Sequence, residues 1–292
     1  MKKIITLIWF LIFTVTVIGQ QAVEYILKAR ALVEAGKPDL AIDILSGAIA
    51  VAKDSRLYIE RAEAKMAKGD YQEAINDFNE ANKIIPSSGE YGLSKIYSLK
   101  GDAGTALYHL EINLSSPFRK GEKEIMLDPA FGSIENSSGW RQFWKKERYS
   151  NIERGISEIE YYISVGKTDE SKEVLSDLKK SYQSDDAIVY AESLINLSAG
   201  KYNEVIRIIN GLLVLNPENE KYLRILAKAQ TGASNPAGAS VTYTRLLGIG
   251  VADAELLIRR AECYRKTGET DKALADIEDY LEIYPENKAA IS

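Results

Sequence analysis

Cysteine and histidine are almost absent from this sequence of 292 residues, and their scarcity excludes several kinds of site. A single cysteine, Cys263, cannot form an internal disulfide, so the fold must be held together by packing. A single histidine, His109, cannot supply a zinc motif with two histidines, and no nucleophile motif accompanies it. We therefore expect Cys263 in the core, His109 in a structural role, no metal, no cofactor and no enzymatic activity.

Long hydrophobic runs are equally scarce. The exception is the uncharged apolar run 4–18, which has 15 residues and follows Lys2 and Lys3. A membrane-spanning helix needs roughly 20 residues, so residues 1–19 are typical of a cleaved secretory signal peptide, with an uncleaved membrane anchor as the alternative. A lipid anchor on a cysteine just after this run is excluded, because Cys263 is the only cysteine. We expect an exported protein, periplasmic or at the cell surface, that meets the membrane only through envelope partners.

Positive charge is not in excess either. The chain has 37 Lys and Arg against 42 Asp and Glu, a formal net charge of −5 that becomes −7 without Lys2 and Lys3. This balance argues against general binding to nucleic acid or anionic lipid, since both attract a positive surface. With 46% hydrophobic residues, 27% charged residues and only 7 prolines, the composition predicts a folded chain with a substantial core.

Glycine marks an internal repeat. Six short stretches begin with Gly and have a small residue or Val five places later: GKPDLA at Gly36, GDYQEA at Gly69, GDAGTA at Gly101, GKTDES at Gly166, GKYNEV at Gly200 and GETDKA at Gly268. Successive copies lie 33, 32, 65, 34 and 68 residues apart, and SNPAGA at Ser234–Ala239 fills the last long gap. Prolines 86, 217 and 285 each follow their Gly by 17 residues. A fixed period of this length predicts a tandem array of supersecondary units.

Each unit is predicted to be a helical hairpin. A Gly after a helix can take the left-handed conformation that ends it, and a polar turn then starts the next helix. In the second helix, apolar residues recur at helical spacing, as in Ala74, Phe78 and Ala81. A proline after the second helix stops it.

The pattern resembles the tetratricopeptide repeat family, over about residues 22–116 and 151–292. The resemblance is carried best by two repeats, with Tyr58, Ala62, Ala74, Phe78, Ala81 and Pro86 in one and Ala261, Tyr264, Ala273, Ile277 and Pro285 in the other. It implies an all-α solenoid of about six to seven units. The expected organisation is a signal peptide over 1–19, N-terminal repeats over 20–116, an irregular Trp-rich connecting segment over 117–150 and C-terminal repeats over 151–292.

The connecting segment contains Trp140 and Trp144, which are spaced to form one aromatic ridge on a helix. One interpretation is that these rings fill the joint between two stacks of hairpins. The other is that one of them anchors a partner, since Trp is enriched at interface hot spots. Solvent exposure would distinguish the two.

The resemblance also implies that the first helices of the hairpins line a concave groove that binds a protein or peptide. The positions expected to face it are Tyr91, Lys95, Tyr190, Leu194, Arg224, Lys228, Ile258, Arg259, Glu262 and Arg265. The groove would become partly basic toward the C-terminus and suit a segment with acidic residues, unless Glu255 and Glu262 simply compensate these charges. The family's clamp for chaperone tails is not reproduced, because Ile225 and Glu255 stand where polar or basic groups are needed.

The expected function is therefore a non-catalytic scaffold or adaptor of the cell envelope that holds a partner in its groove. The alternative is a structural spacer or self-associating module, in which exposed apolar residues such as Leu281 and Ile283 pair with a second copy.

Overall fold

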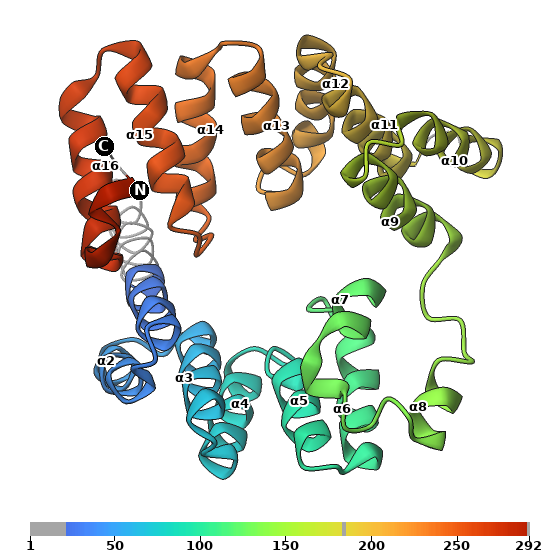
Figure 1. The fold of residues 1–292 in the computed structure, drawn as a ribbon, viewed down its shortest axis with the longest axis vertical. Helices are drawn as coiled ribbons and strands as arrows, with labels where there is room; N and C mark the ends of the chain where they lie inside the picture. Colours follow the sequence, from blue (N-terminus) through green and yellow to red (C-terminus); the bar gives the residue numbers. More distant parts are fainter. Residues whose placement is uncertain (1–21, 183–184, 291–292) are drawn as a thin grey trace, which may run out of the picture. The chain divides into compact units, whose positions relative to one another are not determined.

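The computed structural model describes residues 22–182 and 185–290, and this part of the chain contains helices and turns but no strand. It divides into two compact units, and the chain passes from one to the other between Arg148 and Tyr149 (Figure 1). The predicted signal peptide lies outside the described residues. Among the described residues, no helix has both the length and the apolar character needed to cross a bilayer.

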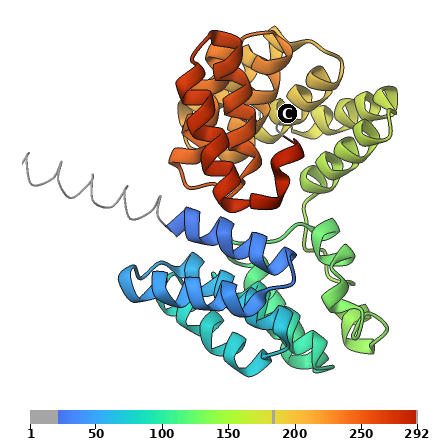
Figure 2. The same cartoon turned by 60° about the vertical axis from the view of Figure 1, so that its left-hand side comes forward.

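Unit 1 contains three helical hairpins (Figure 2). Its helices are residues 22–34, α2 (Pro38–Val51), α3 (Ser55–Lys68), α4 (Tyr71–Ile84), α5 (Glu90–Leu99) and α6 (Ala103–Leu114). From α2 onward each helix packs on the next, and α3 also contacts α5.

Unit 2 contains four more hairpins of the same kind. Its helices are α9 (Asn151–Ser164), α10 (Thr168–Ser181), α11 (Asp186–Ser198), α12 (Tyr202–Leu215), α13 (Glu220–Gly232), α14 (Pro236–Gly248), α15 (Glu255–Thr267) and α16 (Thr270–Ile283), followed by the 3₁₀ helix η2 (Pro285–Ala290). The prediction of an all-α array of about six to seven tandem hairpins is confirmed.

The predicted glycine turns are present in every hairpin that carries one. Gly36, Gly69, Gly101, Gly166, Gly200 and Gly268 all have a positive φ, between 71° and 89°. In each case the second helix of the hairpin begins two residues later. In the hairpin without such a glycine, Ser234 takes the same conformation, with φ 55°. The turn therefore needs the left-handed backbone, and glycine reaches it with the least strain.

Three short helices occupy the segment that was expected to be irregular: α7 (Glu122–Leu127), η1 (Pro129–Phe131) and α8 (Ser138–Phe143). The 3₁₀ helix η1 packs on α5, and α8 packs on α6. The segment thus covers the last hairpin of unit 1, where a following repeat would otherwise pack.

The core of each unit lies between its hairpins. In unit 1, Phe78 of α4 is 1% exposed and packs with Ala62 of α3 and with Leu93 and Ile96 of α5. In unit 2, a cluster of buried residues joins α12 to α15, and Cys263 belongs to it at 4% exposure. The prediction that Cys263 is a core residue is confirmed.

Candidate interaction surface

A pocket of about 560 Å³ opens between α13 and α15, the first helices of the last two hairpins of unit 2. Its α13 wall carries Arg224, Lys228 and Thr231, which the helical period places on one face. Its α15 wall carries Glu255, Arg259, Glu262 and Lys266, which share a face for the same reason. The remaining apolar lining comes mainly from Tyr243 and Leu246 of α14 and from Leu256 and Cys263 of α15.

The pocket exists because α13 and α15 are spaced apart. Elsewhere in unit 2 the first helices touch directly, since α11 packs on both α9 and α13. By contrast, α15 packs mainly on α14 and α16. The connection 249–254 between α14 and α15 is also longer than the connection 216–219 that precedes α13.

Most charged groups of the pocket are already paired. Arg224 contacts Glu220 and Asp253, each at 2.8 Å. Arg259 lies 2.8 Å from Glu255, and Lys266 lies 2.8 Å from Glu262.

The hydrogen bond from Lys266 lowers the pKa of the Glu262 carboxyl against the opposing effect of burial, and the nearby Arg259 adds to the lowering. Glu262 is therefore ionised at neutral pH.

Lys228 differs from the other bases of the pocket. It is exposed, and within residues 22–182 and 185–290 its ammonium forms neither an ion pair nor a hydrogen bond. The pocket therefore has one cation without a counterion among the described residues.

The structure separates the residues that the sequence assigned to the groove of unit 2. Arg224, Lys228, Arg259 and Glu262 line the pocket together, whereas Ile258 and Arg265 of α15 are not part of its lining.

Tyr190 and Leu194 lie on α11 and pack against the core of unit 2. The Tyr190 ring is 5.7 Å from the ring of Tyr222. Tyr190 and Leu194 are therefore packed against neighbouring side chains of unit 2 and do not line the pocket.

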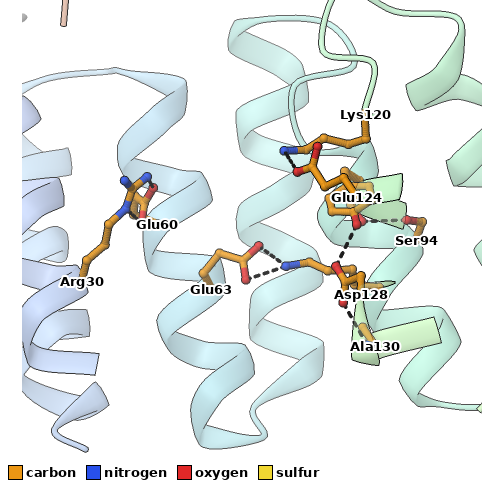
Figure 3. A network of polar contacts seen from close by, with 10 residues as sticks. Arg30, Glu60, Glu63, Ser94, Lys120, Glu124, Asp128 and Ala130 are labelled. Atoms are coloured by element: carbon orange, nitrogen blue, oxygen red, sulfur yellow. Dashed lines mark hydrogen bonds and ion pairs between the residues drawn. The ribbon is translucent and has the colours of Figure 1, made fainter. Parts of the chain in front are cut away.

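The two groove residues assigned to unit 1, Tyr91 and Lys95, are engaged by their own chain. Figure 3 shows their partners, Asp128 and Glu63. Tyr91 of α5 donates a hydrogen bond of 2.7 Å to Asp128. Burial raises the pKa of Tyr91, and the hydrogen bond to Asp128 raises it further. Lys95 reaches Glu63 of α3 at 2.7 Å, and Lys120 lies 5.2 Å from the centre of the Tyr91 ring. The same face also carries the ion pair of Arg30 with Glu60. These side chains already have partners in unit 1.

In the aromatic ridge of the connecting segment, Trp140 is buried within unit 1. Its indole is 6% exposed and stacks on Phe131, with 5.3 Å between ring centres. Trp144 meets it edge-on at 5.6 Å and is partly buried. The Trp140 indole is packed between rings of its own unit, Phe131 and Phe143, so it serves packing.

His109 belongs to a small polar cluster in unit 1. Its Nδ1 atom lies 2.7 Å from Glu90, which also accepts a hydrogen bond of 2.7 Å from Asn82. The His109 ring stacks on Tyr97 at 5.4 Å. Among the residues that the structure describes, no group of His, Cys, Asp and Glu side chains is arranged to hold a metal ion.

Sequence reasoning missed part of the pocket lining, namely Tyr243, Leu246, Asp253 and Lys266. Tyr243 and Leu246 come from a second helix, and only first-helix positions were expected to face a groove. Lys266 could have been found, since it follows Glu262 by one helical turn. Tyr243 and Leu246 line the pocket only because α15 stands apart from α13, which the sequence does not reveal.

Two regions of the chain match family models described as tetratricopeptide repeat, one over residues 26–88 and one over residues 255–287. A search of curated proteins finds no match to the sequence.

Several solved structures are similar to the chain. A tetratricopeptide repeat protein from Parabacteroides merdae is 16% identical, with 93% of this chain and 96% of that chain covered at a TM-score of 0.40. PilW, a widely conserved type IV pilus biogenesis factor, is 12% identical, with 80% and 95% covered at a TM-score of 0.42. A structure of TPR2AB of yeast Sti1 in complex with pHSP90 is 18% identical, with 87% and 99% covered at a TM-score of 0.36. Likenesses this distant say nothing about what the chain binds.

Proposed function

Because the chain belongs to the tetratricopeptide repeat family, we propose that it is a non-catalytic interaction scaffold that holds a segment of a partner protein at the α13–α15 pocket. The observation that carries the proposal is the pocket itself, at about 560 Å³. This volume falls within the range of roughly 300–1,000 Å³ that is usual for ligand sites. Charged walls above an apolar floor also resemble the core and rim of protein interfaces.

The proposed place of action is the cell envelope, in the periplasm or at the cell surface. Lys2, Lys3 and the apolar run 4–18 support export, because a basic start and a short apolar stretch are the features of a signal peptide. Expression of the full chain with fractionation and N-terminal sequencing tests this part. A mature N-terminus near residue 20 in the exported fraction is expected, and an intact Met1 in the cytoplasm would contradict it.

One of the two residues expected to mediate self-association in the spacer alternative is buried. Ile283 was expected on an exposed face, and that expectation is wrong, since Ile283 is only 6% exposed. Ile283 ends α16, and η2 packs on that helix.

Selection of displayed random 12-residue peptides on the mature protein tests the scaffold proposal. The selected peptides should bind the wild type but not Thr231→Trp, because a large ring at this exposed position fills the mouth of the pocket. Ser176→Trp is the matched control, since Ser176 is exposed on α10 and does not line the pocket. The proposal fails if no peptide is enriched, or if the enriched peptides bind Thr231→Trp as well as the wild type.

A further inference from the structure

We infer that the α13–α15 pocket recognises a large apolar side chain that is followed or preceded by an acidic residue, and that Lys228 pairs with that acid. The inference rests on the proposed scaffold function and specifies the chemistry of the partner segment.

The floor of the pocket defines the first half of this preference. Tyr243, Leu256 and Cys263 expose small apolar parts of their side chains to the pocket, at 7%, 4% and 4%, and all three belong to the core cluster of α12 to α15. The aliphatic stems of the lysines and arginines that line the pocket add to this apolar surface. A floor of this kind gains free energy by contact with an apolar side chain, at about 25 cal/mol for each Å² removed from water. The volume of about 560 Å³ leaves room for a phenylalanine or leucine together with its neighbouring backbone.

The charged residues at the rim of the pocket define the preference for an acidic residue. Four bases and three acids line the pocket, namely Arg224, Lys228, Arg259 and Lys266 against Asp253, Glu255 and Glu262. Arg224, Arg259 and Lys266 are paired with acids of their own chain, so they gain little from a further carboxylate. Lys228 has no such partner among the described residues, and it stands on the α13 wall between Arg224 and Thr231. An acidic side chain of the partner would therefore find one unpaired cation in the pocket. A basic side chain of the partner would find no unpaired acid there among the described residues.

The occupant is a partner of this chemistry and not a second copy of the chain. On α7, for example, a second copy would present Met126 and Leu127, which are 50% and 70% exposed, beside Glu124 and Asp128. The neighbouring Asp128 already accepts hydrogen bonds from Tyr91 and from the Ala130 amide, and Glu124 is paired with Lys120. Asp128 and Glu124 are thus engaged within unit 1.

Charge reversal on both sides of the interface tests the inference. The probes are two fluorescein-labelled, amide-capped peptides that carry Glu-Phe-Glu or Lys-Phe-Lys between Gly-Ser spacers, and binding to the full mature chain is measured by fluorescence anisotropy. The wild type should prefer the acidic peptide by about fivefold, which is the upper end for one exposed ion pair. Lys228→Glu should abolish or reverse this preference. Replacement of Phe by Ser in the acidic peptide should weaken binding by at least about tenfold.

Lys201→Glu is the matched control, because Lys201 is exposed in the same unit but lies outside the pocket. It makes the same charge change and should leave the preference intact. Lys228 is exposed, so its replacement is not expected to unfold the chain, and circular dichroism verifies this.

The outcomes separate the inference from the scaffold proposal. If display-selected peptides bind at the pocket but Lys228→Glu leaves the acidic preference unchanged, the inference is wrong and the scaffold proposal stands. If neither selected nor synthetic peptides bind, both are wrong. If sedimentation shows a dimer of the wild type that Lys228→Glu dissociates, the occupant is a second copy and the inference is overturned.

Discussion

Arg260 of α15 holds Asp276 of α16 through two hydrogen bonds, from Nε to Oδ2 at 2.9 Å and from Nη2 to Oδ1 at 2.6 Å. A third bond of 3.1 Å from Arg260 reaches Thr244 on α14, the second helix of the preceding hairpin. The same arrangement recurs in unit 1, where Arg61 binds Asp77 at 2.9 and 2.6 Å and Ser46 at 3.0 Å. One arginine therefore ties together the two helices of its own hairpin and the hairpin before it.

Asp276→Ala should destabilise unit 2 by about 3 kcal/mol, because it leaves the guanidinium of Arg260 without its bidentate partner in a largely buried place. Chemical denaturation followed by circular dichroism measures the loss. The exposed Glu278 on the same helix provides the control, and Glu278→Ala should change stability by about 0.5 kcal/mol or less. The double variant Arg260→Met with Asp276→Leu should recover most of the loss, since two apolar groups leave no charge unpaired. A loss in the double variant as large as in Asp276→Ala would contradict this account.

Alanine at Gly200 and at Gly47 should have effects of opposite sign. Gly200 has φ 72°, so a Cβ there is strained by roughly 1–2 kcal/mol, and Gly200→Ala should lower the unfolding midpoint. Gly47 lies within α2 with no atom close to a built Cβ, so Gly47→Ala should stabilise by about 0.5–1 kcal/mol. Equal shifts in the two variants would show that the left-handed turn is not required.

Gly92→Ala should disturb the core of unit 1. A Cβ at this position of α5 would overlap the ring of Phe78, which is 1% exposed and cannot move aside. We expect a loss of about 1–3 kcal/mol from overpacking, measured by thermal or urea unfolding. Gly211→Ala on α12, where a Cβ meets no atom, should not be destabilising. Phe78→Leu combined with Gly92→Ala should be less destabilised than the sum of the two single variants, since the smaller side chain relieves the overlap.

Asp128→Ala should loosen the segment that covers the last hairpin of unit 1. Asp128 accepts the hydroxyl of Tyr91 at 2.7 Å and the amide of Ala130 at 2.9 Å, so its removal frees both the contact with α5 and the start of η1. Limited trypsin digestion should cut faster at Lys120 or Lys123 in this variant. Glu135→Ala, at an exposed residue of the same segment, should be cut at the wild-type rate. Unchanged digestion of Asp128→Ala would show that packing alone holds the segment.

Unit 2 should lose stability in alkaline solution through Tyr190. Burial raises the pKa of this phenol from 10.0 to about 12, and the charge of Glu160 adds to the effect. The folded state therefore favours the neutral phenol, and the free energy of unfolding should be fully retained below pH 10 and fall as the pH rises from 10 to 12. Urea unfolding at several alkaline pH values should show a shallower fall for Tyr190→Phe, whose side chain cannot ionise. Identical slopes in the two proteins would contradict the prediction.

The sequence by itself determined the repeat and its turns. A glycine that can adopt positive φ ends the first helix wherever it stands in phase, so six glycines located six hairpins, and prolines 86, 217 and 285 each follow the end of a second helix by two residues. These signals are local, because each depends on the conformation of one or two residues and not on distant contacts. Cys263 was expected in the core because a lone cysteine cannot form an internal disulfide, and its side chain is 4% exposed.

Only the tertiary structure decided which groove residues are available. Tyr91 and Lys95 were assigned to a groove together with Arg224 and Lys228, yet Asp128 and Glu63 of the chain engage the first two. The spacing of α13 and α15 opens a pocket around the other two. The difference arises from contacts between residues that are distant in sequence, such as Tyr91 and Asp128, which are 37 positions apart. A repeat pattern specifies which way a side chain points, but the packing of neighbouring helices determines what it meets there.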